Sequence, residues 1–341
     1  MLATRPTRTR GTVIELGQRD AQLWRDLQEV VLRHAESYAM RRSVAAQETS
    51  FFTTASRKPA FPPYHLYSYV SPMPETEKLE THLKSLGRVV LGYSGGVDSG
   101  LLAVVGARAL GPERFLAVTG RSASFPEVQA GGAVQLARDF GIPFREIDTH
   151  ELSDPRYLSN STDRCYYCKS ELWARLSEVV TQLGFDVIID GTNADDLGEH
   201  RPGLRASGEH AVRSPLAELG WTKDEVRQAA RELGLPTWSA PAAPCLSSRV
   251  VYGLEITPQR LGQVEQGESF LRSLGIAGDL RVRHHGHKAR LEVAPDQMSR
   301  LTDHWETIER TFRGLGFAAV ELDPRGYRRG GLLSLAPQRP D

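Results

Sequence analysis

Residues 89–110, VVLGYSGGVDSGLLAVVGARAL, constrain the fold more than any other stretch. Strand-forming residues end in a loop of Ser94, Gly95, Gly96, Val97, Asp98 and Ser99, and apolar residues at helical spacing follow at once. Such a strand–loop–helix junction collects backbone N–H groups at the positive end of a helix, where phosphate is favoured. The two glycines allow a close approach of the anion, and the two serines add hydroxyl donors. The lysine of the common nucleotide-hydrolase loop is absent.

Strand-like and helical segments alternate after this loop. The sequence predicts strands at 88–94, 114–120, 143–150 and 186–192, with helices from 98 and over 126–141, 172–184 and 222–234. This alternation predicts an α/β fold, a parallel Rossmann-like sheet with helices on both faces. Ligands of such sheets bind beyond the carboxyl ends of the strands, where the glycine and serine loop falls.

The chain divides into four parts by its patterns. Residues 73–250 carry the sheet, and 251–333 predict a small α+β domain with helices over 257–275 and 295–316. Its strand or hairpin at 279–294 contains three histidines, which we interpret as a solvated face, and a further strand is predicted at 317–323. Residues 334–341 form a polar tail.

Residues 1–72 are interpreted as a poorly ordered leader or a mis-assigned start, with one candidate amphipathic helix. We expect the functional protein to begin near Met73. An organellar targeting leader is the rival, but such leaders are poor in acidic residues and this one is not.

Composition excludes several function classes. Forty-two basic residues balance forty-two acidic ones, so no overall field gathers nucleic acid. No apolar run is long enough for a membrane span, and no secretory signal opens the chain, which predicts a cytoplasmic protein. Three cysteines are too few for a disulfide scaffold.

The cysteines predict thiol, metal or cluster chemistry. Cys165 and Cys168 form a C-x-x-C pair at the start of a helix that Ser161 or Asp163 could cap, an end that favours thiolates. A redox pair would leave Cys245 without a role, and a structural zinc would need a fourth ligand such as His200 or His287. Three thiolates suit a [4Fe-4S] cluster with one open iron. Three small buried hydrophobic residues are the remaining alternative.

The loop resembles the S-G-G-x-D-S loop of PP-loop ATP pyrophosphatases, the superfamily of NAD synthetase, GMP synthetase and tRNA-thiolating enzymes. This resemblance implies that the loop holds the pyrophosphate that leaves when a substrate oxygen attacks the α-phosphorus of ATP. It also implies that Asp98 helps to hold Mg²⁺.

Motifs at 91–106, 163–173, 190–206, 212–238 and 244–257 together resemble the LarE family of ATP-dependent sulfur transferases. That family adenylates the two carboxylates of pyridinium-3,5-biscarboxylic acid mononucleotide and replaces an oxygen of each with sulfur. Some members sacrifice the sulfur of a single cysteine, and others carry three cysteines that hold a [4Fe-4S] cluster with an extra sulfide. This sequence is similar to the three-cysteine kind, which implies Cys165, Cys168 and Cys245 as catalytic cluster ligands.

A charged middle segment and the residues beside the cysteines complete the candidate site. A substrate with two carboxylates and a phosphate needs planar, permanently charged donors, which arginine supplies. The candidate substrate-binding residues are Lys169, Ser170, Arg205, Arg213 and Arg249. The candidate Mg²⁺ ligands beside Asp98 are Asp195, Asp196 and Glu199. An alternative is a solvated loop whose charges neutralise one another.

Two rival functions stay open at the sequence level. A tRNA thiolase would combine the same loop and cysteines with a basic surface, which the balanced charge argues against. A non-catalytic iron–sulfur or zinc module would show no substrate-dependent release of AMP and pyrophosphate. The preferred reading predicts ATP, Mg²⁺ and a [4Fe-4S] cluster as cofactors and a small pyridinium mononucleotide as substrate. The family resemblance further implies a homo-oligomer, and the sulfide donor stays unknown.

Overall fold

The computed structural model describes residues 74–198 and 202–328. The predicted leader, Glu199, His200 and the C-terminal tail lie outside these residues. No helix in the described part of the chain is both long enough and apolar enough to cross a membrane.

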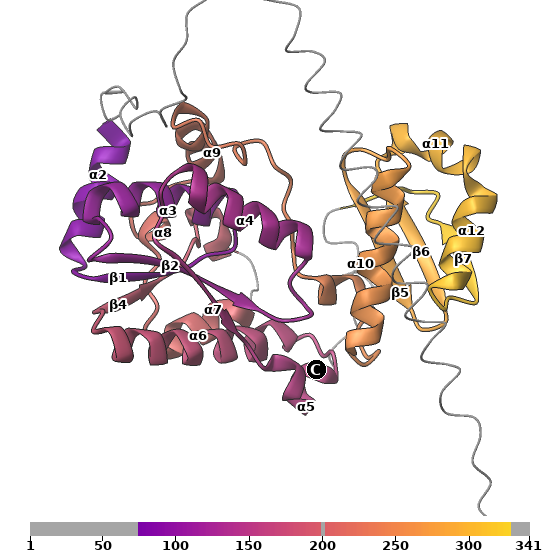
Figure 1. The fold of residues 1–341 in the computed structure, drawn as a ribbon, viewed down its shortest axis with the longest axis horizontal. Coiled ribbons are helices and arrows are strands. Elements are labelled where there is room, and N and C mark those ends of the chain that lie inside the picture. Colours follow the sequence, from indigo (N-terminus) through magenta and orange to yellow (C-terminus); the bar gives the residue numbers. More distant parts are fainter. Residues whose placement is uncertain (1–73, 199–201, 329–341) are drawn as a thin grey trace, which may run out of the picture. The chain divides into compact units, whose positions relative to one another are not determined.

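A four-stranded parallel sheet carries the first part of the fold (Figure 1). Its strands are β1 (Val89–Gly92), β2 (Phe115–Arg121), β3 (Phe144–Asp148) and β4 (Val187–Ile189). All three pairings are parallel and the order is β3-β2-β1-β4, which confirms the predicted α/β sheet. Because the chain moves outward to β3 and then returns to the other side of β1, the carboxyl end of β1 lies at the switch point where ligands bind.

Helices cover both faces of this sheet, as Figure 1 shows for α3 and α4 on one side and α6 on the other. Val89 and Leu91 of β1 pack in one apolar core with side chains of the first group of helices. Val90, from the intervening position, packs with α6 on the opposite face. The first group is α2 (Pro74–Ser85), α3 (Val97–Leu110), α4 (Glu127–Asp139) and α9 (Lys223–Glu232).

On the second face, α6 (Arg164–Leu183) buries Trp173, Leu176 and Val179, and α7 (Pro202–Glu209) packs against it. Helix α6 begins before both cysteines of the C-x-x-C pair. Short elements connect the larger ones: η1 (Glu151–Ser153), α5 (Pro155–Leu158), η2 (Ala194–Gly198), α8 (Pro215–Glu218) and η3 (Leu246–Arg249).

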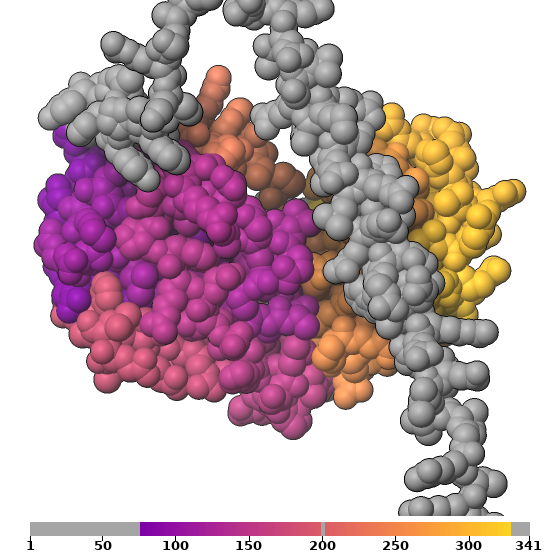
Figure 2. Space-filling model, viewed as in Figure 1, coloured from indigo at the N-terminus to yellow at the C-terminus, as the bar shows by residue number. Residues whose placement is uncertain are grey.

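The C-terminal residues form a three-stranded sheet with helices, in agreement with the predicted α+β segment. Strand β6 (Lys288–Val293) lies between an antiparallel β5 (Leu280–His285) and a parallel β7 (Ala319–Leu322). The remaining elements are α10 (Pro258–Ser273), η4 (Pro295–Gln297), α11 (Met298–Asp303) and α12 (Trp305–Gly314). In the space-filling view, indigo marks α2 and yellow marks α11 and α12 (Figure 2).

Two expectations for this segment were wrong. The helix predicted over 295–316 is broken at His304 into α11 and α12, and Leu301 of α11 and Phe312 of α12 enter one core. The histidines on β5 do not form a solvated face. His284 is buried and its ring contacts Gln263 through Nε2 at 2.9 Å, and burial lowers its pKa to about 4.

Candidate functional site

The residues of the glycine and serine loop lie at the carboxyl end of β1, as predicted. Helix α3 begins at Val97 with Gly96 as its N-cap, and no side chain caps this helix end. Ser94 Oγ and Ser99 Oγ lie 3.1 Å apart at the loop. Gly95 has a φ of 72°, and a Cβ there would lie 2.8 Å from the Cβ of Ala133 on α4. The loop therefore needs glycine at this position, and the first N–H groups of α3 have no side-chain cap.

Asp98, the predicted Mg²⁺ ligand, has a partner that sequence reasoning missed. Lys223 Nζ lies 2.5 Å from Asp98 Oδ2, and Asn193 Nδ2 donates to Asp98 Oδ1 at 3.1 Å. The backbone N–H of Lys223 donates to Asp195 Oδ2 at 2.9 Å, so this one residue connects two of the predicted carboxylates. The sequence did contain a signal for Lys223. A lysine in the first turn of a helix is unfavourable beside the positive end of the helix dipole, so its presence there indicates a role other than stabilising the helix.

The other charged residues of the middle segment are engaged locally. Asp196 Oδ2 accepts a hydrogen bond from the backbone N–H of Asn193 at 3.2 Å. Arg213 forms a bidentate pair with Glu218, with both distances at 2.7 Å, and this pair lowers the pKa of Glu218 to about 2. Arg205 lies over the ring of Tyr166 at 3.8 Å. Both arginines, predicted from the sequence to bind substrate, thus have local partners in this structure.

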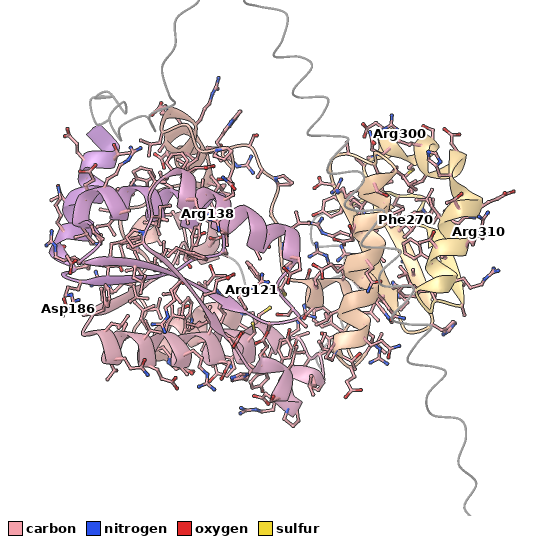
Figure 3. The ribbon with its side chains drawn as sticks, in the orientation of Figure 1. Arg121, Arg138, Asp186, Phe270, Arg300 and Arg310 are labelled. Atoms are coloured by element: carbon pink, nitrogen blue, oxygen red, sulfur yellow. The ribbon has the colours of Figure 1, made fainter. Side chains whose placement is uncertain are left out.

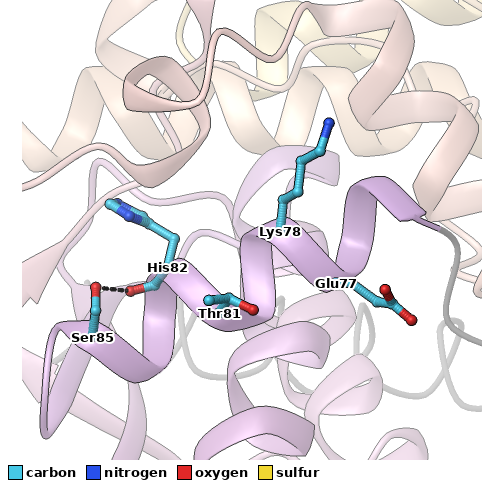
Figure 4. A pocket seen from close by; sticks show the side chains of 5 residues that line it. All are labelled: Glu77, Lys78, Thr81, His82 and Ser85. Atoms are coloured by element: carbon cyan, nitrogen blue, oxygen red, sulfur yellow. Dashed lines mark hydrogen bonds between the residues drawn. The ribbon is translucent and has the colours of Figure 1, made fainter.

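A surface pocket of about 640 Å³ lies on α2 (Figure 4). It contains none of the predicted site residues. Its lining residues are Glu77, Lys78, Thr81, His82 and Ser85. The Nε2 atom of His82 contacts Glu218 at 2.8 Å, next to the Arg213 pair.

The structure brings the three cysteines into electrostatic range of one another. Cys165 and Cys168 lie in the first turns of α6, and Cys245 directly precedes η3. Burial raises the pKa of Cys168 well above its ordinary value, and the charges of Glu151, Cys245 and Cys165 raise it further. Burial and then Cys245 likewise raise the pKa of Cys165, because protein surrounds this thiol although part of its surface is exposed.

This result differs from the expectation that the helix end favours thiolates. Asp163 is the N-cap residue of α6, but its side chain makes no capping hydrogen bond. Burial and mutual repulsion outweigh the helix dipole, so the raised pKa values of Cys165 and Cys168 disfavour their thiolate forms. A metal centre changes this balance, because coordination deprotonates a thiol outright.

Buried arginines hold the segment that carries Cys245. Arg249 is 4% exposed; it donates to the carbonyl oxygens of Cys245, at 3.0 Å, and Pro244, and pairs with Glu268 at 3.0 Å. Arg283 donates to the carbonyl oxygen of Ser248 at 2.9 Å and pairs with Glu292. Arg249, predicted to bind substrate, is therefore a brace for the backbone at Cys245 in this structure.

Further residues of α6 and one residue of η1 complete the surroundings of the cysteines. Lys169 Nζ lies over the ring of Trp173 at 4.7 Å, and its charge acts to lower the pKa of Cys165 and Cys168. Ser170 Oγ is buried and has no hydrogen-bond partner among the described residues. Sequence reasoning missed Glu151, a carboxylate that is 2% exposed and accepts hydrogen bonds from Ser122 and, at 2.7 Å, Ser124.

The loop after β2 connects these groups to the Cys245 segment. The backbone N–H of Leu246 donates to the carbonyl oxygen of Ser124 at 2.8 Å. Arg121 ends β2, where Figure 3 labels it, and pairs with Glu127 of α4 at 2.7 Å. The carboxyl end of the sheet therefore carries both the ATP-type loop and the loop that positions a cysteine.

The described residues contain no group of three or more His, Cys, Asp or Glu side chains arranged to hold a single metal ion. A cubane cluster has a wider ligand spacing than one ion, and three thiolates leave one of its irons open. The buried Nε of Arg164, next to Cys165, also has no partner among the described residues. A donor set of three thiols with an orphaned cationic N–H fits an anionic iron–sulfur cluster.

The chain is similar in sequence to several known proteins. The sequence profile of the NAD synthase family matches residues 76–176. The pyridinium-3,5-bisthiocarboxylic acid mononucleotide synthase of Lactiplantibacillus plantarum is 35% identical over 248 residues, which cover 73% of this chain and 90% of that protein. An uncharacterized protein of Synechocystis is 42% identical over 258 residues, covering 75% of this chain and 96% of the relative.

A more distant relative is one of the subunits of the glutamine-hydrolyzing GMP synthase of Thermococcus kodakarensis. It is 26% identical over 271 residues, which cover 66% of this chain and 84% of that protein. The match to the NAD synthase profile contains the glycine and serine loop. With the extent of the match to the pyridinium mononucleotide synthase, these similarities show that the chain belongs to the LarE family, within the PP-loop proteins.

Proposed function

We propose that the protein is an ATP-dependent sulfur transferase that converts the carboxylates of pyridinium-3,5-biscarboxylic acid mononucleotide to thiocarboxylates. One observation carries the proposal: the loop at 94–99 opens at the carboxyl end of the sheet whose β2 loop positions Cys245. An ATP-activating site and a set of three thiols are thereby attached to one scaffold.

The reaction needs both parts because a carboxylate does not expel oxide. A carboxylate oxygen of the substrate attacks the α-phosphorus of ATP, pyrophosphate leaves, and an acyl adenylate forms. A sulfur nucleophile then adds to the carbonyl carbon, and AMP leaves with the oxygen that the substrate contributed. The products are a thiocarboxylate, AMP and pyrophosphate.

Each part of the loop has a role in the first half-reaction. The uncapped N–H groups at the start of α3 and the hydroxyls of Ser94 and Ser99 bind the phosphates. Asp98 would hold Mg²⁺ on those phosphates, with Asp195 beside it. Lys223 neutralises Asp98 in the free protein and, when Mg·ATP enters, is placed to bind the leaving pyrophosphate.

Cys165, Cys168 and Cys245 would hold a [4Fe-4S] cluster, which supplies a transferable sulfide when it is bound. The chain's own residues keep the cysteine segment in place, with Arg249 and Arg283 donating to its backbone. We expect repeated turnover, since no cysteine sulfur is consumed. We further propose a cytoplasmic homo-oligomer acting on a small molecule, without nucleic acid.

Release of AMP and pyrophosphate, measured with and without the pyridinium dicarboxylate mononucleotide, tests the enzyme. We expect substrate-dependent release and a product in which sulfur has replaced oxygen, detected by mass spectrometry. Release that does not depend on the substrate would contradict the proposal. Stimulation by bulk tRNA instead would favour a tRNA thiolase.

Anaerobic reconstitution with iron and sulfide tests the sulfur source. We expect about four irons per chain in the wild type and a loss of iron in C245S. Conversion of one cysteine to dehydroalanine during turnover, seen in the intact mass of the protein, would show cysteine sacrifice instead.

A further inference from the structure

Arg164, the first residue of α6, is a buried arginine beside the cysteines. It is 3% exposed. One terminal nitrogen, Nη1, donates to Asn160 Oδ1 and to the carbonyl oxygen of Ser247 at 2.9 Å. The guanidinium also lies over the ring of Tyr252 at 5.1 Å. These contacts orient the group, but none of them supplies a negative charge.

The charge of Arg164 is not compensated by a carboxylate, in contrast to its neighbours. Arg249 is paired with Glu268 and Arg283 with Glu292, and all these side chains are largely buried. Within residues 74–198 and 202–328, Arg164 forms no ion pair, and its Nε is buried without a hydrogen-bond partner. A buried cation of this kind is costly unless an anion faces it.

The groups that can provide this anion are sulfurs. Arg164 directly precedes Cys165 at the start of α6. Its hydrogen bond to the carbonyl oxygen of Ser247 holds the guanidinium beside the segment that begins with Cys245, two residues earlier. The cation is therefore placed between a cysteine of α6 and the cysteine that precedes η3.

We propose that Arg164 is a positioning residue whose uncompensated charge and free Nε–H stabilise the anionic iron–sulfur cluster bound by Cys165, Cys168 and Cys245. This inference rests on the proposed function and adds to it the residue that counterbalances the cluster. Arg164 contacts no substrate in this role and acts through the cluster alone.

The sign of the effect on the cluster follows from its charge. One-electron reduction makes the cluster more negative, so a nearby fixed cation favours the reduced form and raises the reduction potential. Removing the cation lowers that potential and weakens retention of the cluster. A residue that only supported the fold would change stability without moving the potential.

The test compares the wild type with R164Q, R164K and R283K after anaerobic reconstitution. A redox titration gives the midpoint potential, and iron release to a chelator gives the retention of the cluster. We expect R164Q to reduce the equilibrium constant for reduction about tenfold, which is about 59 mV for a one-electron couple. R164K keeps the charge without the Nε–H and should lie between R164Q and the wild type.

R283K is the matched control, because Arg283 is buried and braces the same segment but its charge is balanced by Glu292. Its midpoint should equal that of the wild type. An R164Q midpoint equal to that of the wild type would overturn the inference and leave the proposed function intact. A wild type that binds no cluster would overturn both.

If R164Q does not accumulate as a folded protein, R164M, which also removes the charge, decides the matter. Unchanged midpoint and unchanged iron release in R164M would then overturn the role of Arg164. A lower midpoint in R164M with an unchanged one in R283K would support it.

Discussion

Lys223 is the residue whose contacts most directly report on ATP binding. It bridges Asp98 of the loop and Asp195 of η2. We expect K223M to raise the KM for ATP by about tenfold or more, because a charge-assisted hydrogen bond contributes ~1.5–3 kcal/mol. Pyrophosphate release at varied ATP concentration measures this change.

The control for this prediction is K288M. Lys288 also forms a short pair with a carboxylate, Glu321 at 2.8 Å, but on the C-terminal sheet. We expect its KM for ATP to equal that of the wild type. Equal increases in both variants would contradict a specific role for Lys223.

The lowered pKa of His284 predicts a loss of stability at mildly acidic pH. Its pKa of about 4 in the folded protein lies below its ordinary value of 6.5, so the folded state stays neutral where the unfolded state takes up a proton. The contribution of His284 to the unfolding free energy is complete above pH ~6.5. It falls as the pH drops toward ~4, by about 3 kcal/mol in total at ~1.36 kcal/mol per unit of pKa.

Urea unfolding at several pH values checks this prediction. Between pH 6.5 and 4, we expect the unfolding free energy of H284Q to fall much less than that of the wild type. H287Q, which changes an exposed histidine of the same hairpin, should retain it. An unaltered pH dependence in H284Q would show that other groups cause the decrease.

At the residue scale, a sequence indicates the chemistry of a site more readily than the contacts of its side chains. The loop residues and the cysteines were proposed because their types and spacing are typical of that chemistry. Arg164, Glu151 and Lys223 were not proposed because their significance lies in burial and in contacts with residues far away in the chain. Arg213 was proposed for its charge, and this charge gave no sign of its pair with Glu218 five positions later.

At the scale of elements, helix α9 connects stability to ATP binding. Thr222 caps it, and a reciprocal capping box joins Thr222 with Glu225. T222A should lower the unfolding free energy by about 1 kcal/mol through loss of the cap. Because Lys223 is the next residue, T222A should also raise the KM for ATP.

T257A is the matched change on α10, where Thr257 accepts a hydrogen bond from the backbone N–H of Arg260 at 3.2 Å. We expect a similar loss of stability with an unchanged KM for ATP. If T222A alters only stability, the position of Lys223 does not depend on the cap.

The regular elements followed from periodicity, and the irregular ones did not. Long strands and helices were predicted because their patterns of apolar residues are local. The break at His304 was not predicted because no proline or glycine stands beside it to mark it. The 3-10 turn η3 escaped for a similar reason, since arginines from other segments hold it.

At the scale of the whole molecule, the alignments bear on the expected start near Met73. The 258 residues aligned with the Synechocystis relative make up 75% of this chain but 96% of that protein. We therefore expect a chain that begins at Met73 to retain substrate-dependent pyrophosphate release. Assays of both lengths at equal concentration check this. Loss of release in the shorter chain, with an unchanged circular dichroism spectrum, would assign a role to the leader.

The split origin of the three cysteines has a consequence for biosynthesis. Cys165 and Cys168 leave the ribosome well before Cys245, and the segment after Cys245 is braced by Arg283, which emerges later still. On the proposed role of these thiols, the segment of the third ligand is braced by Arg283 only after the C-terminal sheet has folded. Cluster loading is then a late, post-translational step, and iron content becomes a measure of how many chains have completed folding.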